Sequence, residues 1–198
     1  RIPAIHVDVA LPSWKREFAA LTHGIRFDYA FVHYDFIETV RPELDQLPYR
    51  PRLVSHRPNT PTGIGFMVDN AAVGVVAAEF FLRRGLLNLG YLGIEREAIH
   101  SLPRGRAFCR TAIHGGANTC REFVWSQNVA NTAKLLAYLE ALPKPCGIFA
   151  YNDLTARNLL TFCRIYGFAV PDTIAILGAD DDESLCEAAT PSLSSVAI

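Results

Sequence analysis

Short apolar runs alternate with longer amphipathic stretches along most of this chain. Most of the runs are rich in β-branched and aromatic residues and end at polar or turn-forming residues, which is typical of buried strands. The predicted strands cover residues 4–9, 29–34, 52–56, 65–68, 89–93, 121–125, 146–151 and 173–178. Helical patterns lie between them, at 13–21, 35–47, 71–84, 108–113, 128–142 and 153–166. Strands joined by helices of this length predict an α/β fold with parallel, doubly wound sheets.

Several of these helices carry their own boundary signals. Ser13 and Asp35 are predicted to cap the helices that follow them, because their side chains can accept hydrogen bonds from free backbone N–H groups. Pro42 is expected to interrupt the second helix, since proline has no N–H to donate. Ser101 and Arg104 are expected to lie in a loop that opens the fourth helix.

The number of strand–helix units predicts two lobes. About eight such units are too many for one sheet in a chain of 198 residues. The stretch at 58–65 is rich in proline and glycine, so we expect the boundary there. We therefore predict an N-terminal lobe over residues 1–65, with three strands, and a C-terminal lobe over residues 66–198.

The composition is that of a folded protein with balanced charge. Half of the residues are apolar and 20% are charged, so the chain can bury a full core. The net charge of −1 gives no basic excess, and if the protein controls a gene we expect its DNA-reading part outside this chain. No apolar run approaches the ~20 residues of a transmembrane helix. The N-terminus shows no secretion signal, so we expect a cytosolic protein, or one whose signal was removed, that does not act at a membrane.

The cysteines and histidines form no metal or catalytic pattern. The cysteines are odd in number and widely spaced, so we expect reduced, mostly buried thiols: Cys109, Cys120, Cys146, Cys163 and Cys186. The glycine-rich signatures of dinucleotide and nucleotide sites are missing, as is the serine elbow of α/β-hydrolases. The sequence therefore predicts no metal, no cofactor and no catalytic residue.

Polar side chains follow several predicted strands, at the carboxyl ends where ligands bind in open α/β sheets. Asp69, Trp125, Asn152 and Asp180 each come after a strand, and Arg104 lies after residues 89–93. Carboxylates and amides can hold paired hydroxyls while an aromatic face covers C–H edges, so this set suits a sugar or polyol. Helix capping explains Asp69 equally well, and ordinary packing explains Arg104 and Trp125 equally well.

The C-terminal two thirds resemble lactose-repressor-type regulators. The motifs are GIFAYNDLTAR at 147–157 and GFAVPDTIAILGADD at 167–181. SLPRGRAF at 101–108 is similar to the family's S-x-x-R-x-x-G-F, with Ala107 in place of glycine. The tail at 185–196 resembles the xylose-operon-regulator subgroup, in which such a sensor is fused to an AraC-type DNA-binding domain.

The resemblance implies a periplasmic-binding-protein-like fold whose N-terminal lobe is incomplete here, and a DNA-binding domain that is absent from this chain. It implies a homodimer, and it assigns Arg104, Asn152 and Asp180 to contacts with an inducer. Asp69 falls on the family's acidic position at the lobe junction, and Trp125 on an aromatic position in the sugar cleft. Departures from the family pattern predict that the effector can differ from xylose.

We therefore predict the effector domain of a bacterial transcription regulator, in which a pentose or hexose binds between the lobes and the closed form controls DNA binding. Two alternatives stay open: a periplasmic sugar-binding protein of a transporter, and a Rossmann-like sugar-modifying enzyme. The missing signal and the five cysteines count against the first. The missing nucleophile, phosphate and metal motifs count against the second. A purely structural or interaction role is the fallback.

Overall fold

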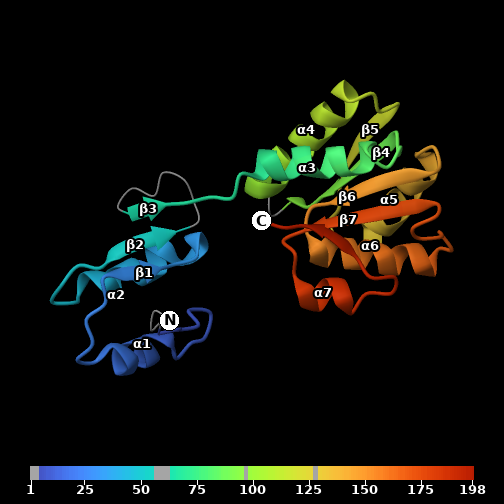
Figure 1. Ribbon diagram of the computed structural model, residues 1–198. Helices are drawn as coiled ribbons and strands as arrows, with labels where there is room; N and C mark the ends of the chain where they lie inside the picture. Colours follow the sequence, from blue (N-terminus) through green and yellow to red (C-terminus); the bar gives the residue numbers. More distant parts are fainter. Residues whose placement is uncertain (1–4, 56–62, 96–97, 127–128) are drawn as a thin grey trace. The chain divides into compact units, whose positions relative to one another are not determined.

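The computed structural model describes residues 5–55, 63–95, 98–126 and 129–198 (Figure 1). The chain divides into two compact units, Arg1–Val68 and Asp69–Ile198. This division lies just beyond the predicted boundary at residue 65. The assignment of the two units to an N-terminal and a C-terminal lobe stays a prediction, and each unit is described by itself.

The first unit is built on a parallel sheet with the strand order β1-β2-β3. Its elements are α1 (Trp14–Thr22), β1 (Tyr29–Phe31), the 3-10 helix η1 (Tyr34–Phe36), α2 (Ile37–Asp45), β2 (Arg52–Ser55) and β3 (Gly63–Gly65). A small buried core joins the helices to β2, and it consists of Trp14, Ile37, Val40, Leu44 and Leu53. The strands predicted at 29–34 and 52–56 appear as β1 and β2, and β3 takes the place of the third predicted strand at 4–9.

Two strand predictions for this unit are wrong. Ile5–Val9 form no strand, because the Asp8 carboxylate accepts a backbone N–H two residues further on, at 3.0 Å, and turns the chain toward α1. Residues 66–68 lie after β3 and not within a strand. Pairing with β2 places Gly65 opposite Ser55, so the strand ends before the apolar residues that suggested it.

Helix boundaries in this unit also depart from their signals. Asp35 lies inside η1, so the N-cap of α2 is Phe36 and not Asp35. Pro42 does not interrupt α2, which runs through it, because the buried apolar face of this helix stabilises it despite one lost hydrogen bond. Ser13 is the N-cap of α1, although its side chain makes no capping hydrogen bond.

The second unit has a parallel sheet with the strand order β5-β4-β6-β7-β8. Its strands are β4 (Asn88–Gly93), β5 (Thr119–Val124), β6 (Cys146–Ala150), β7 (Ile174–Ala179) and β8 (Ser194–Val196). Its helices are α3 (Asn70–Leu82), α4 (Ala98–His114), α5 (Val129–Ala141), α6 (Asp153–Ile165) and the short α7 (Glu183–Glu187). The strands predicted here all appear, with ends shifted by a residue or two. The apolar pattern did not predict α7, and Asn128 lies outside the described residues.

Helices cover both faces of this sheet (Figure 1). On one face α3 and α4 pack around Phe81, Phe108 and Phe149. On the other face α5 and α6 pack around Leu135, Ile148 and other buried side chains. Every residue of β6 is buried, which explains why this strand reads as a continuous apolar run and not as an alternating one. The second unit is therefore a three-layer α/β/α sandwich, as the prediction of a doubly wound sheet requires.

Helix α4 begins earlier than predicted. Ser101 and Arg104 lie within it and not in a preceding loop, and Pro103 lies within the same helix. Close contact with α3 holds this segment helical, because Gly74 of α3 lets the backbone of α4 approach directly. Tertiary packing here overrides the helix-breaking tendency of proline.

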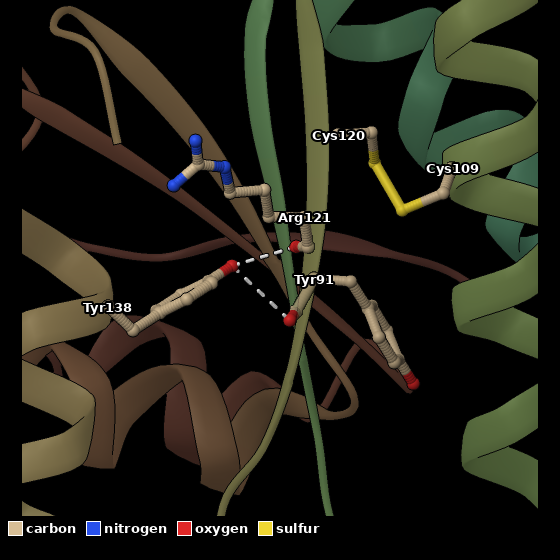
Figure 2. The surroundings of a disulfide bond; sticks show 5 residues. All are labelled: Tyr91, Cys109, Cys120, Arg121 and Tyr138. Atoms are coloured by element: carbon tan, nitrogen blue, oxygen red, sulfur yellow. Dashed lines mark hydrogen bonds between the residues drawn. A yellow bond between two sulfur atoms is a disulfide. The ribbon is translucent and has the colours of Figure 1, made fainter. Parts of the chain in front are cut away.

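Two of the five cysteines are bonded, contrary to the expectation of reduced thiols. Cys109 of α4 and Cys120 of β5 form a disulfide, with their Cα atoms 5.3 Å apart (Figure 2). Cys146 and Cys163 are free and buried, and Cys186 is free and partly exposed. The sequence separation of 11 residues gave no sign of this pairing, because the contact depends on how α4 packs beside β5.

Tyr138 of α5 ties that helix to the edge of the sheet. Its hydroxyl donates to the carbonyl oxygen of Arg121 at 2.9 Å and lies 3.4 Å from that of Tyr91 (Figure 2). Burial raises the pKa of Tyr138, so the hydroxyl keeps the proton that these bonds need.

Replacing Gly74 with alanine is expected to destabilise the protein. A Cβ at this position would lie 2.2 Å from the carbonyl oxygen of Arg104 and 2.9 Å from the amide nitrogen of Phe108, so the two helices would have to separate. We expect the free energy of unfolding, measured with urea, to fall by about 1–3 kcal/mol, as in other overpacked cores.

The matched control is Val76→Ala, on the same helix at a residue that is 45% exposed. It should change the free energy of unfolding by less than about 0.5 kcal/mol. If Gly74→Ala were as stable as the parent, the close approach of α3 and α4 would be wrong.

Candidate functional site

The strand order of the second unit creates a switch point between β4 and β6. From β4 the chain passes through α4 to β5 on one side, and it then returns through α5 to β6 on the other side of β4. Ligands of open α/β sheets bind outside the carboxyl ends of the strands at such a point. A site is therefore expected among the residues that follow β4, β6 and β7.

Arg104 of α4 is the centre of a buried polar cluster at this edge, and its side chain is 4% exposed. Its Nε donates to Oδ1 of Asn70, the first residue of α3, at 2.7 Å. Its Nη1 donates to the carbonyl oxygen of Tyr151, just after β6, at 2.7 Å. The same Nη1 donates to Oδ1 of Asp180, just after β7, at 3.2 Å. One guanidinium thus joins the start of α3 to the ends of two strands.

Asp180 is the solvent-facing member of this cluster, with its side chain 40% exposed. Its φ of 108° lies in the region that glycine favours, and so does the φ of 57° at Asp181. Its N–H donates to the carbonyl oxygen of Val196 in β8 at 3.1 Å. Partial burial raises the pKa of Asp180, and the Arg104 guanidinium offsets part of that rise.

The Arg104–Asp180 pair has donor and acceptor atoms that remain available to a ligand. Among the described residues, neither Nη2 of Arg104 nor Oδ2 of Asp180 has a hydrogen-bond partner. The pair can therefore offer two donor hydrogens beside one carboxylate oxygen. A ligand with neighbouring groups that both donate and accept would match this arrangement.

Asn70 is a member of the cluster that the sequence reasoning did not single out. It is 3% exposed, and because its amide oxygen faces Arg104, its Nδ2 faces Nδ1 of His100 at 3.2 Å. An asparagine at the start of a helix resembles an ordinary cap in sequence. Only the packing of α3 against α4 shows that Asn70 orients the arginine.

The other predicted site residues do not join this cluster directly. Oδ1 of Asp69 accepts from the N–H of Ala72 at 2.9 Å, so Asp69 caps α3. Oδ1 of Asn152 accepts from the N–H of Thr155 at 2.9 Å, so Asn152 caps α6. Trp125 packs against the core on the α5–α6 face. Of the five predicted residues, the structure brings Arg104 and Asp180 into contact.

Within the part of the chain that the structure describes, no cluster of three or more His, Cys, Asp and Glu side chains is arranged to hold a metal ion. Nor does any helix there have both the length and the apolar character that crossing a membrane needs.

Residues 78–198 match the model of the family described as periplasmic binding protein-like domain. This stretch contains β4 to β8 and both members of the Arg104–Asp180 pair. The chain belongs to this family. The periplasmic-binding-protein-like fold predicted from the sequence is therefore confirmed.

The relatives include two xylose operon regulatory proteins. The one from Haemophilus influenzae is 40% identical over 139 residues, which cover 65% of this chain and 35% of that protein. The one from Escherichia coli K12 is 33% identical over 129 residues, which cover 56% of this chain and 32% of that protein. The chain spans about a third of the length of these two relatives.

A solved structure is similar over nearly the whole chain. It is the periplasmic binding protein/LacI transcriptional regulator from Alkaliphilus metalliredigens, crystallised with D-xylulofuranose. The TM-score is 0.63 at 15% identity, covering 94% of this chain and 68% of that one. At this level of identity the similarity shows the fold alone.

Replacing Arg104 with methionine is expected to destabilise the protein in a pH-dependent way. The variant leaves Asp180 and Asn70 without their charged partner, which should lower the free energy of unfolding by about 1–3 kcal/mol at neutral pH. Without the guanidinium the pKa of Asp180 should rise further, because the effect of burial remains. A raised pKa in the folded state means stability that is lost as the pH rises through that pKa, so the deficit should shrink in acid.

Urea unfolding of parent and variant between neutral pH and about pH 4, near the ordinary range of an aspartate pKa, measures this. The control makes the same Arg104→Met change in an Asp180→Asn protein: the titrating group is then absent from both proteins compared, so the deficit of the double variant relative to Asp180→Asn should not depend on pH. A deficit for Arg104→Met alone that stays constant over this range would contradict the coupling.

Proposed function

We propose that this chain is the effector-binding domain of a transcription regulator, and that its effector is a sugar. The observation that best supports this is the Arg104–Asp180 pair at the switch point of the second unit. The family and the two xylose operon regulatory proteins among the relatives support the same class of protein.

The chemistry of the pair suits a neutral polyol. The guanidinium and the carboxylate compensate each other's charge, so a neutral ligand adds no unpaired charge to a partly buried site. A sugar hydroxyl can accept from Nη2 of Arg104 while its neighbour donates to Oδ2 of Asp180. A pentose or hexose carries such neighbouring hydroxyls, and this is the ligand class we propose.

Three further residues extend the proposed site. Asn152 uses its Oδ1 for the cap of α6, which leaves its Nδ2 as a donor for a ligand. Trp125 would offer an aromatic face to the C–H edges of a sugar ring. Asp69, at the start of α3, would add a carboxylate.

In this proposal the domain senses and does not catalyse. Effector binding would shift the population of conformers, and a DNA-binding domain outside this chain would respond. The proposal includes a cytoplasmic homodimer, as the resemblance to lactose-repressor-type regulators implies. The named relatives are operon regulators, which favours this function over a transporter component or a sugar-modifying enzyme.

A sugar effector should raise the thermal unfolding midpoint of the chain. A ligand that binds only the folded state stabilises it by mass action, by about 2.7 kcal/mol at a concentration 100 times its Kd. The measurement is a thermal-shift screen against pentoses, hexoses, sugar acids and polyols. We expect a saturable shift with one of them, and we expect Asp180→Asn to abolish it, because the amide cannot replace the carboxylate acceptor.

Asp181→Asn is the matched control. It lies next in the same loop and shares the positive φ that aspartate and asparagine both tolerate, but its side chain takes no part in the Arg104 cluster. It should keep the full shift. If no sugar or polyol shifts the parent, the sugar effector is wrong. An equal shift in Asp180→Asn would move the site elsewhere.

A further inference from the structure

Asp153 is the most deeply buried carboxylate among the described residues, at 1% exposed, and no role has been assigned to it. It is the first residue of α6 and follows Asn152, which already caps that helix. Its carboxylate is therefore not needed for capping. Burying a charged group without partners is costly, so the contacts of the Asp153 carboxylate must explain why it is buried.

Both carboxylate oxygens of Asp153 accept hydrogen bonds from the segment around β7 and β8. Oδ2 accepts from the backbone N–H of Asp182 at 2.8 Å. Oδ1 accepts from the hydroxyl of Ser195 at 2.6 Å. Burial, together with the nearby charge of Asp153, raises the pKa of the Cys186 thiol to about 11.

The approach of Asp153 to β7 requires a glycine. A Cβ on Gly178 would lie 2.0 Å from Oδ1 of Asp153, so any other residue there would displace the carboxylate. Gly178 lies two residues before Asp180. The strand thus makes room for the carboxylate immediately before the loop that carries the proposed ligand contact.

The loop after β7 depends on these contacts for its shape. Asp180 and Asp181 both have positive φ, a conformation that costs free energy and persists only where surrounding contacts hold it. The N–H of Asp181 donates to Oγ of Ser195 at 3.0 Å, and the hydroxyl of Ser195 in turn donates to Asp153. With the direct bond from Asp182, two successive amides of the loop are held by the same buried carboxylate.

We propose that Asp153 is a positioning residue for effector binding: it holds the loop after β7 so that the Asp180 carboxylate is presented beside Arg104. Asp153 acts through Ser195 and the backbone of Asp182 and not by touching the ligand. This inference rests on the proposed function for its ligand, while the loop geometry can be tested without any sugar.

The first test measures amide hydrogen exchange by NMR at Asp181 and Asp182 in the parent protein, Asp153→Asn, Asp153→Ala and Leu154→Ala. We expect exchange at these two amides to be at least about tenfold faster in Asp153→Ala, because each amide loses its acceptor or the group that orients it. Asp153→Asn keeps one acceptor oxygen and should give a smaller increase. Amides of β6 and β7 should stay protected in both variants.

Leu154→Ala is the control, since Leu154 is the next residue of α6 and is 41% exposed. It should leave exchange at both amides unchanged. If Asp153→Ala does not fold, Asp153→Asn and Ser195→Ala decide: Ser195→Ala should accelerate exchange at Asp181, whose acceptor it removes. Parent-like exchange at both amides in Asp153→Asn and Ser195→Ala would overturn the proposal.

The second test measures binding of D-xylose by calorimetry in the same proteins and in Asp180→Asn. Loss of Asp153 should weaken binding about tenfold, the change that corresponds to one charged hydrogen bond. Asp180→Asn should weaken binding without changing exchange at Asp181 and Asp182, which separates a ligand contact from a positioning residue. Full affinity in an Asp153 variant with a loosened loop would overturn the proposal.

The two tests distinguish a failure of the proposed function from a failure of the positioning role. If the parent binds neither D-xylose nor any sugar of the thermal-shift screen, the proposed function is wrong, and hydrogen exchange alone still decides whether Asp153 holds the loop. If the parent binds a sugar and exchange does not respond to Asp153, the function stands and the positioning role is wrong.

Discussion

The second unit depends on one buried cation, the guanidinium of Arg104. A charged group at 4% exposure is tolerated only if hydrogen bonds compensate for the water that it loses, and here three groups from separate elements accept from Nε and Nη1 of Arg104. Asn70 begins α3, Tyr151 follows β6 and Asp180 follows β7. The requirement to satisfy one side chain therefore fixes where a helix start and two strand ends lie relative to α4. The same requirement leaves a single carboxylate oxygen and one guanidinium nitrogen available at the edge of the sheet.

Close backbone packing supports this arrangement. Gly74 allows α3 to lie directly against the stretch of α4 that carries Arg104, and Gly105 leaves room for the ring of Tyr91. The Cys109–Cys120 disulfide fastens the far part of α4 to the edge strand β5. These contacts hold α4 along its length, so Arg104 lies on a rigid element. A binding group on such an element keeps its geometry better than one on a loop.

Asp180, the other member of the Arg104–Asp180 pair, lies on a loop. Contacts other than helix packing must therefore hold its geometry. Positive φ at Asp180 and Asp181 is unfavourable for residues with a Cβ, and contacts from β8 and α6 offset this. Val196 and Ser195 of β8 accept from the amides of Asp180 and Asp181, and Asp153 in turn accepts from the Ser195 hydroxyl and from the amide of Asp182. In the proposed ligand contact, helix packing therefore fixes Arg104, and the buried carboxylate of Asp153 holds the loop that carries Asp180.

The sequence by itself determined the fold class and the C-terminal strands, because buried parallel strands read as apolar runs whatever their neighbours are. It also placed Arg104 and Asp180 after strands, where sites of this fold lie. It misplaced the start of α4 and the effect of Pro42, since propensity is weaker than the burial of an apolar helix face. Only the tertiary structure decided that Asn70 orients the arginine, that Asp153 holds a loop and that Cys109 meets Cys120. Each of these depends on contacts between elements distant along the chain, and a short polar side chain looks the same in sequence whether it caps its own helix or bonds to another element.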